Sequence, residues 1–248
     1  MIIALASVPV VNKDIGHNLS VILQTMSECS GRADMVVFGE SALQGFDCLC
    51  WDHAADLRMA VSQQDECLSA IRTAARQLNI AVSFGCIEAE GDVLYSTQFV
   101  IDSSGDIIHR FHRVSQGWKE YWRTDAHYQE GEHFESFEYG GKRFAIGLCG
   151  DLWTEGRPEE MRALHADIVL WPVWCDFTAE EWNQSEKHEY TRQAALCGEC
   201  VLYVNPFCTD EHAPDKANGG CAFFKDGSIV NELPAGKSGI LFVELPSE

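Results

Sequence analysis

Three residues that could support nucleophilic chemistry stand where apolar or strand-like runs of this sequence end. In the stretch FAIGLCGDLW, Cys149 follows an apolar run and precedes Gly150 and an aspartate. Glu40 ends the run VVFGE, and Arg113 ends the basic stretch HRFHR. In α/β proteins, functional side chains gather where strands end and loops begin, so we expect these residues to meet.

The chemistry that these residues could support is the attack of a thiol on a carbonyl-type carbon. A thiol is a strong nucleophile only when another group holds or takes its proton. A carboxylate in a poorly solvated pocket can take it, because desolvation raises the pKa of such a group toward neutrality, and Glu40 is the candidate. The tetrahedral intermediate also needs N–H donors and positive charge. The Gly150 backbone is the candidate donor, and the cation should come from the basic stretch HRFHRVSQGWKE at the third strand end.

Each of the three residues also has a structural interpretation. Cys149 could be a thiol packed in the core, and Glu40 could be a solvated carboxylate at a strand end. Arg113 could pair with a surface carboxylate, as many arginines do.

The elements that must position these residues alternate between strands and helices, with hairpins in the middle of the chain. Helices are predicted at 18–26, at 62–80 with Ser62 as its cap, from Pro158 to 164, and at 178–196 with a Thr178/Glu181 capping box. Strands are predicted at 2–8, 34–40, 80–88, 94–102, 107–113, as a hairpin within 133–151, and at 167–173, 200–205, 219–224 and 239–245, with the turn KDGS between the last two. This order indicates an α/β protein with mixed sheets.

Composition limits the classes of protein to be considered. A chain of 248 residues with 46% hydrophobic residues and no linker-like tract suits a single domain over 1–248. The formal net charge of −20 argues against nucleic acid as a partner. No apolar stretch has the length of a membrane span, and the first ten residues lack the basic flank of a signal peptide.

The eleven cysteines point to a reducing compartment, which we expect to be the cytoplasm. Two close pairs, Cys48 with Cys50 and Cys197 with Cys200, could be metal or redox sites. Neither pair has the second pair or the spaced histidines of a structural zinc site, so we interpret them as ordinary thiols and expect no metal.

The whole chain resembles the nitrilase or carbon–nitrogen hydrolase family. FGESALQGF is similar to its first motif, SGDIIHRFHRVS to its second, and AIGLCGDLW followed by RPEEMRALHADIVLWP to its third. The closing NGGCAFFKDGSIV and GILFVEL are similar to the usual end of the family.

The resemblance implies a four-layer α-β-β-α sandwich with two mixed sheets, a homodimer or larger oligomer, and no cofactor. It also implies a Glu–Lys–Cys triad that hydrolyses a non-peptide amide, carbamoyl or nitrile group through a thioester. The form C-x-D-L-W is more similar to the amidases and glutaminases of the family than to its nitrilases, so a small linear amide is the expected substrate.

The chain departs from the family at the catalytic lysine, where it has Arg113. An arginine can stabilise an oxyanion but cannot give up a proton near neutral pH. Lys119 is therefore a second candidate for the cation, and Glu120 stands close to the place where some family members keep a second active-site glutamate. The alternative for both is a solvated pair on a loop.

The third motif departs as well, because Trp153 occupies the position of a family arginine and TEG is inserted before RPEE. Trp153, Trp174 and Phe46 are candidates for the walls of a substrate pocket, although large aromatic residues near strand ends often belong to the core.

Two rival interpretations remain at this point. The change from lysine to arginine favours a non-catalytic family member that binds an amide or carboxylate ligand as a sensor or partner protein. A papain-like Cys–His protease would need a histidine such as His165 or His188, but neither lies in a recognisable local signature.

Overall fold

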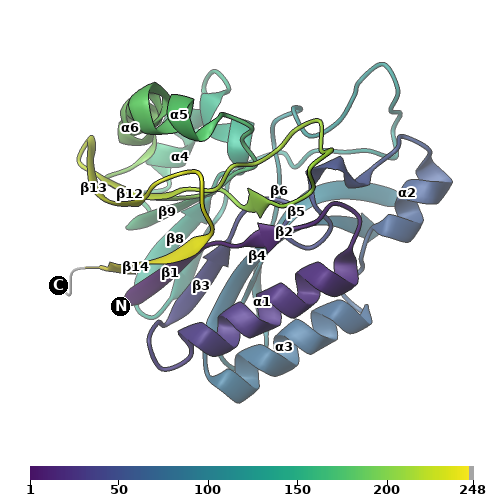
Figure 1. Ribbon diagram of the computed structural model, residues 1–248, viewed down its shortest axis with the longest axis horizontal. Coiled ribbons are helices and arrows are strands. Elements are labelled where there is room, and N and C mark those ends of the chain that lie inside the picture. Colours follow the sequence, from purple (N-terminus) through teal and green to yellow (C-terminus); the bar gives the residue numbers. More distant parts are fainter. Residues whose placement is uncertain (246–248) are drawn as a thin grey trace.

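A computed structural model describes residues 1–245 of the chain, and within them the strands form two six-stranded sheets (Figure 1). The first sheet has the order β14-β1-β3-β4-β5-β6, made of Gly239–Glu244, Ile2–Ser7, Met35–Phe38, Ala81–Glu90, Val93–Ile101 and Ile107–His112. The second has the order β13-β12-β10-β9-β8-β7, made of Ser228–Leu233, Cys221–Lys225, Cys200–Val204, Ile168–Pro172, Lys142–Ile146 and Ser136–Tyr139. Each sheet is parallel at its centre and antiparallel toward its edges.

Helices cover the outer face of each sheet, which confirms the expected four-layer α-β-β-α sandwich (Figure 1). Helices α1 (Ile15–Cys29) and α3 (Glu66–Leu78) pack on the first sheet. Helices α4 (Arg157–Ala163) and α6 (Lys187–Cys197) pack on the second. The other described elements are helix α2 (His53–Met59), the short pair of β2 (Pro9–Val10) and β11 (Phe207–Cys208), and short helical segments at Phe46–Cys48, Cys149–Trp153, Ala179–Glu181 (α5) and Trp182–Glu186.

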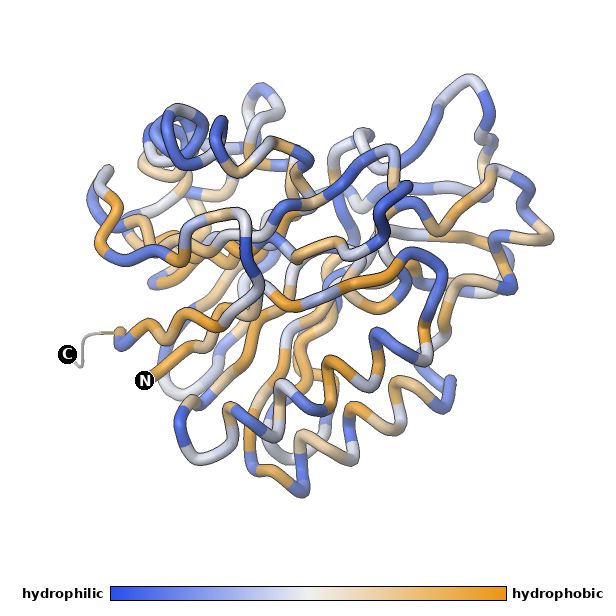
Figure 2. The backbone as a smooth tube through the Cα atoms, in the orientation of Figure 1, coloured by the Kyte–Doolittle hydropathy of each residue, from blue (hydrophilic) through white to orange (hydrophobic). Residues whose placement is uncertain are grey.

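The central strands are apolar on both faces because both faces are covered, which is typical of parallel strands in α/β proteins. In β1, Ile3 and Leu5 point into the core between the two sheets, and Ala4 and Ala6 face the helices. Figure 2 shows the same pattern, with hydrophobic colour along the central strands and alternating colour along α1 and α3.

Several sequence predictions need correction. Asp65, not Ser62, is the N-cap residue of α3, and the Ser62 backbone N–H bonds to the Asp65 side chain. The predicted helix 178–196 begins with its Thr178 capping box but contains a π-helical turn at Trp182–Glu186. The turn KDGS joins β12 to β13, a strand that the sequence prediction missed, rather than leading directly to β14.

Each helix of the described residues is either too short or too polar to serve as a transmembrane span. All eleven cysteines lie within 1–245 and are free thiols. The single domain over 1–248 stays a prediction, and its last three residues lie outside those described.

Candidate active site

Glu40 stands two residues after β3, a strand in the interior of the first sheet, and its side chain is buried. Its backbone N–H donates to the carbonyl of Val173, which belongs to the chain that leaves β9 in the second sheet (3.2 Å). Its Oε1 accepts hydrogen bonds from Ser96 Oγ (3.2 Å) and from Arg113. Its Oε2 has no hydrogen-bond partner among the described residues, although it is buried. A buried carboxylate oxygen without a partner is unusual and marks a place where a proton or a ligand would be accepted.

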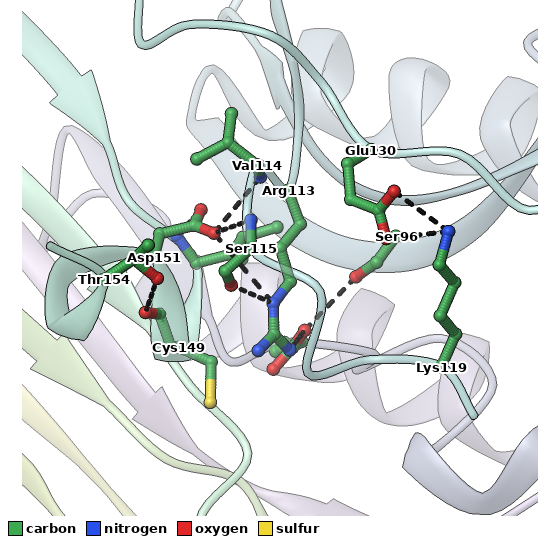
Figure 3. A network of polar contacts seen from close by, with 12 residues as sticks. Ser96, Arg113, Val114, Ser115, Lys119, Glu130, Cys149, Asp151 and Thr154 are labelled. Carbon is green, nitrogen blue, oxygen red and sulfur yellow. Dashed lines mark hydrogen bonds and ion pairs between the residues drawn. The ribbon is translucent and has the colours of Figure 1, made fainter. Parts of the chain in front are cut away.

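Arg113 follows the last residue of β6 and forms a buried ion pair with Glu40, in which Nη1 and Oε1 are 2.8 Å apart. Its Nε donates to Ser115 Oγ (2.9 Å), so two of its three nitrogens are held (Figure 3). Burial lowers the pKa of the guanidinium, but the charges of Glu40, Cys149 and Asp151 more than offset this and raise the pKa above its ordinary value. Arg113 therefore stays positively charged at every pH at which the protein is folded.

Cys149 opens a short 3-10 turn, Cys149–Trp153, that follows β8, and the residue is partly exposed. Its φ of +45° lies in the left-handed region, which a non-glycine residue occupies only when its surroundings impose it. The Trp171 indole donates to the Cys149 carbonyl (2.9 Å) and helps to hold this conformation. Ser41, directly after Glu40, has the same kind of conformation, with φ +52°. Backbone strain at both strand ends is typical of functional sites.

Asp151 joins the turn that carries Cys149 to the segment that carries Arg113. Its Oδ1 accepts from the backbone N–H groups of Val114 (3.1 Å) and Ser115 (2.7 Å), and its Oδ2 accepts from Leu148 N–H (2.8 Å). Burial raises the pKa of Asp151 to about 6, against the opposing effects of Arg113 and of these hydrogen bonds. This carboxylate fixes the position of the cation relative to the thiol.

The surroundings of Cys149 favour its thiolate. A hydrogen bond with the Cys175 side chain and the charge of Arg113 lower the pKa of Cys149, and they outweigh burial and the charge of Glu40, which raise it. Its Sγ also lies 3.7 Å from the Trp174 carbonyl oxygen. A thiol with a lowered pKa beside a cation is the environment of a reactive cysteine.

Two glycines leave room around the third nitrogen of Arg113. A Cβ atom at Gly150 or at Gly117 would lie 2.9 Å from Arg113 Nη2, which is too close for normal packing. The hydrogen bonds of Nε and Nη1 leave Nη2 without a protein partner within residues 1–245. Nη2 and the Gly150 backbone N–H are therefore available to a negatively charged oxygen near Cys149.

A cavity of about 490 Å³ adjoins this cluster, within the range of sites for small ligands. Gly117 contributes to its wall and also lies against Arg113, so cavity and cation are neighbours. Aromatic and charged side chains line it: Phe46, Trp51, Trp118, Lys13, Lys119, Asp47, Glu120 and Asp215. Cys149, Glu40 and Arg113 are not among its lining residues, so Gly117 is the residue that connects the cavity wall to the cluster.

Lys119 and Glu120 line this cavity and make no bond to Glu40, Arg113 or Cys149 in the described part of the chain. The Lys119 ammonium pairs with Glu130 (2.8 Å) and donates to the carbonyl of Tyr128. Figure 3 shows Arg113 between Cys149 and Lys119, with the lysine directed toward Glu130. The Glu120 carboxylate is partly exposed, and its Oε2 is 3.4 Å from Arg123.

The three aromatic candidates have different surroundings. Phe46 lines the cavity and stacks on the buried ring of Trp174, with centroids 5.9 Å apart. The Trp174 indole donates to the Asp215 carbonyl (2.7 Å) at the same cavity. Trp153 is 43% exposed and packs edge-on against Tyr190, away from the cavity lining.

Sequence reasoning missed several residues of this cluster. Ser96 lies in the middle of β5, and Gly85 lies in the middle of β4, where a Cβ atom would be 2.5 Å from the backbone nitrogen of Ser41. Neither has a local sequence signal, because only strand pairing brings them to Glu40. Cys175 did have a signal, since it stands shortly after the apolar run DIVLWPV.

Comparison with known proteins supports the resemblance seen in the sequence. The carbon-nitrogen hydrolase family model matches residues 2–248. An (R)-stereoselective amidase from Pseudomonas sp. is 25% identical over 157 residues, which are 63% of this chain and 54% of that protein. An aliphatic nitrilase from Rhodococcus rhodochrous is 24% identical, over 87% of this chain and 64% of that protein. The chain thus spans less than two thirds of the length of these two relatives.

The fold is shared with an amidase from Nesterenkonia sp. AN1, with a TM-score of 0.77. The match covers 99% of this chain and 93% of that one, at 20% sequence identity. At this identity the likeness concerns the fold alone.

Proposed function

The chain belongs to the carbon–nitrogen hydrolase family, and from this premise we propose that it hydrolyses the C–N bond of a small linear amide or carbamoyl compound. One observation carries the proposal: the buried ion pair of Glu40 and Arg113, which leaves Glu40 Oε2 free in the surroundings of a partly exposed Cys149. A base, a permanent cation and a thiol are the three groups that acyl transfer to sulfur requires.

The reaction begins when Cys149 Sγ attacks the carbonyl carbon and Glu40 Oε2 takes the thiol proton. The new C–S bond and the opened C=O bond give a tetrahedral oxyanion, which the Arg113 guanidinium and the Gly150 N–H stabilise. The C–N bond then breaks, and the leaving nitrogen takes the proton from Glu40, so that ammonia or an amine departs and a thioester remains. Water attacks the thioester, and Glu40 accepts the proton of the water. The C–S bond then breaks to release the acid, and Glu40 gives its proton to the departing sulfur, which restores the Cys149 thiol and the ionised Glu40.

Because residue 113 is an arginine and not a lysine, fewer groups of this site can transfer protons during the reaction. Because its guanidinium does not deprotonate near neutral pH, it acts as a charge and a hydrogen-bond donor only. Every proton transfer in the cycle therefore falls to Glu40. Lys119, whose ammonium is paired with Glu130, and Glu120 would contact the far part of the substrate from the cavity wall.

The relatives support both an amide and a nitrile as the substrate, since one is an amidase and the other a nitrilase. In one mutant of the Nesterenkonia amidase, acrylamide adds to the active-site cysteine by Michael addition. We favour an amide because Gly150 and Asp151 follow Cys149 here, as in the amidase-like form of the motif. Phe46 and Trp174 would form the apolar wall beside the acyl group, and Trp153 would stand outside it.

We further propose that the protein works in a reducing compartment such as the cytoplasm, and that it forms a homodimer. The eleven free thiols support the first proposal. The dimer is proposed on family resemblance alone.

The test combines ammonia release from a panel of two- to five-carbon amides and matching nitriles with intact-mass spectrometry. The wild-type protein is expected to release ammonia and to carry a transient acyl adduct on Cys149. Cys149→Ala should lose both while its circular dichroism spectrum is unchanged, and Cys50→Ala, which removes an exposed thiol, should keep both. Arg113→Lys should retain turnover, because an ammonium can still pair with Glu40.

Turnover that persists in Cys149→Ala would contradict the proposal. A protein that releases no ammonia and forms no adduct, but whose melting temperature rises with an amide, would instead be a binding protein.

A further inference from the structure

Two successive residues of β5, Ser96 and Thr97, each donate a side-chain hydroxyl to a buried carboxylate. The Ser96 hydroxyl donates to Glu40 Oε1 (3.2 Å). The Thr97 hydroxyl donates to Glu88 Oε2 (3.0 Å). Successive side chains of a strand point to opposite faces of the sheet, so the two hydroxyls lie on opposite faces of β5. Both residues are buried, with exposures of 2% and 0%, so the strand carries two similar groups, only one of which contacts the proposed site.

The carboxylate of Glu88 has partners at both of its oxygens. Its Oε1 accepts from Arg110 Nη1 (3.1 Å) and from Gln63 Nε2 (3.2 Å). Its Oε2 is bonded to Thr97 and lies 3.1 Å from His112 Nε2. Because no oxygen is left for a ligand, this is the arrangement of a carboxylate with a structural role.

The carboxylate of Glu40 has partners at one oxygen only. Its Oε1 accepts from both Ser96 Oγ and Arg113 Nη1, whereas Oε2 has no partner within residues 1–245. An arginine and a carboxylate frequently pair through two parallel hydrogen bonds, which would occupy both oxygens. Contacts from outside the ion pair are therefore needed to hold it at one hydrogen bond.

The backbone of Glu40 is fixed by contacts that do not involve Ser96. Its N–H donates to the Val173 carbonyl (3.2 Å). A Cβ atom at Gly85 would lie 2.8 Å from Glu40 Cα, so β4 packs directly against this residue. The last torsion of a glutamate side chain is broad, so the rotation of the carboxylate is limited by the bonds that its oxygens make.

Ser96 contacts both members of the ion pair. Its backbone carbonyl accepts from the Arg113 N–H (2.8 Å), and its hydroxyl donates to Glu40 Oε1. The Ser115 hydroxyl holds the guanidinium at Nε, and the Ser96 hydroxyl holds the carboxylate. The backbone bond is available to any residue at position 96, so a substitution there removes the contact with the carboxylate alone.

We propose that Ser96 is a positioning residue that keeps the ion pair of Glu40 and Arg113 at a single hydrogen bond. Without its hydroxyl, the carboxylate turns until both oxygens meet the guanidinium, and Glu40 Oε2 binds Arg113 Nη2. The base and the oxyanion donor are then bound to each other and lost to the substrate. This inference rests on the proposed function, in which these two atoms take the proton and stabilise the oxyanion.

The first test compares the kinetics of Ser96→Ala with those of Thr97→Val, which removes the matched hydroxyl on the other face of the strand. For an amide that the wild type hydrolyses, kcat should fall about 10- to 100-fold in Ser96→Ala, the effect of one hydrogen bond to a charged group. KM should stay nearly unchanged, because Ser96 does not line the cavity. Thr97→Val should keep the kcat of the wild type, and Ser96→Thr, which retains a hydroxyl, should recover most of it.

The second test is a pair of crystal structures, of the wild type and of Ser96→Ala, and it needs no substrate. The variant should show two contacts between the nitrogens of Arg113 and the oxygens of Glu40, where the wild type has one. If Ser96→Ala does not fold, Ser96→Cys takes its place in both tests, because its thiol is only a weak donor.

Four results would each overturn the proposal. The first is a single contact between Glu40 and Arg113 in the crystal structure of Ser96→Ala. The second is an unchanged kcat in that variant. The third is a kcat in Ser96→Thr as low as in Ser96→Ala, and the fourth is an equal loss in Thr97→Val, because the hydroxyl at position 96 would then have no specific effect.

The crystal structures separate this inference from the proposed function. Two contacts in Ser96→Ala of a protein that hydrolyses no amide would support the role of Ser96 in the ion pair and contradict the proposed function. Amide hydrolysis by the wild type, together with a single contact in Ser96→Ala, would support the function and overturn the inference.

Discussion

At the scale of single residues, the ion pair of Arg113 with Glu40 determines which atoms of the two side chains remain without a protein partner within residues 1–245. The guanidinium has three nitrogens, and the bonds to Ser115 and Glu40 use two of them. This geometry directs the third nitrogen, Nη2, between Gly117 and Gly150. A lysine would have a single nitrogen for all of these contacts, so the arginine gains a fixed orientation and loses the ability to exchange protons.

Gly150→Ala tests this arrangement, because its Cβ atom would lie 2.9 Å from Arg113 Nη2 and would displace the guanidinium. We expect kcat for an amide substrate to fall about 100-fold, the order of loss for a misplacement of about 1 Å at a reacting centre. Steady-state kinetics and the melting temperature are the measurements. The control is Gly16→Ala in α1, where the nearest atom to the new Cβ is 3.7 Å away. Equal activity of both variants would mean that Nη2 has no role at the oxyanion.

Glu40, Arg113 and Cys149 could be identified from sequence because an apolar or strand-like run ends at each of them. Their surroundings could not be predicted in the same way. Ser96 reaches Glu40 from the middle of a strand, and its position there depends on the pairing of β4 with both β5 and β3. Pairing between strands far apart in sequence, such as β3 and β4, leaves no mark on the residues concerned.

At the scale of elements, the site depends on the link between the turn after β8 and the segment after β6. Asp151 supplies this link through three backbone N–H groups. Because it is buried, the folded protein holds its proton at a higher pH than the unfolded chain does. The sign of its effect on stability follows from this difference. The stabilising contribution of Asp151 to the free energy of unfolding is fully present below the ordinary pKa of 3.8. It is lost as the pH rises through about 6.

Asp151→Asn should therefore remove part of the decrease in the free energy of unfolding that the wild type shows as the pH rises from 4 to 6.5. Between pH 4 and pH 6.5, the free energy of unfolding of the wild type should fall relative to the variant by up to about 3 kcal/mol, the equivalent of roughly two pKa units. Other carboxyl groups are common to both proteins and cancel in the difference. Urea unfolding at several pH values gives the measurement. A constant difference across this range would show that Asp151 is ionised throughout.

The errors in element prediction also have physical reasons. The stretch from Thr178 to residue 196 contains no glycine or proline, so the π-helical turn at Trp182–Glu186 has no breaker to announce it. Strand β13 was missed because it lies at the edge of its sheet, where none of its residues is buried and the apolar pattern is weak. Ser62 and Asp65 are both good capping residues, and their order in sequence does not tell which one begins α3.

At the scale of the whole molecule, stability comes from the core between the two sheets. Leu5 of β1 lies there, fully buried, and its backbone carbonyl lies 3.4 Å from Cys221 Sγ of the other sheet. Leu196 of α6 is a leucine of the same size that is 55% exposed. Substitutions at Leu5 and Leu196 therefore separate the effect of burial on stability from the effect of residue type.

Leu5→Ala should lower the free energy of unfolding by about 2–5 kcal/mol, because a cavity remains between the closely packed sheets. Leu196→Ala should change it by about 0.5 kcal/mol or less. Urea titration followed by tryptophan fluorescence measures both. Similar losses for the two variants would mean that the contact between the sheets contributes little to stability.

The alternation of strands and helices could be predicted from the sequence pattern, because apolar strands covered on both faces differ from amphipathic helices in their pattern. The order of the four layers was expected from the family resemblance. The way in which the two sheets face each other was not accessible. The Glu40 N–H bond to Val173 joins segments 133 positions apart, and no periodicity reports such a contact.

The proposed acid and cation follow strands of one sheet, and the proposed nucleophile, Cys149, follows a strand of the other. The first sheet gains its edge strand β14 only from the last described part of the chain. During synthesis, Cys149 would therefore lack the neighbouring cation and carboxylate until both sheets have docked. The raised reactivity that we propose for this thiol would thus arise only in the folded chain.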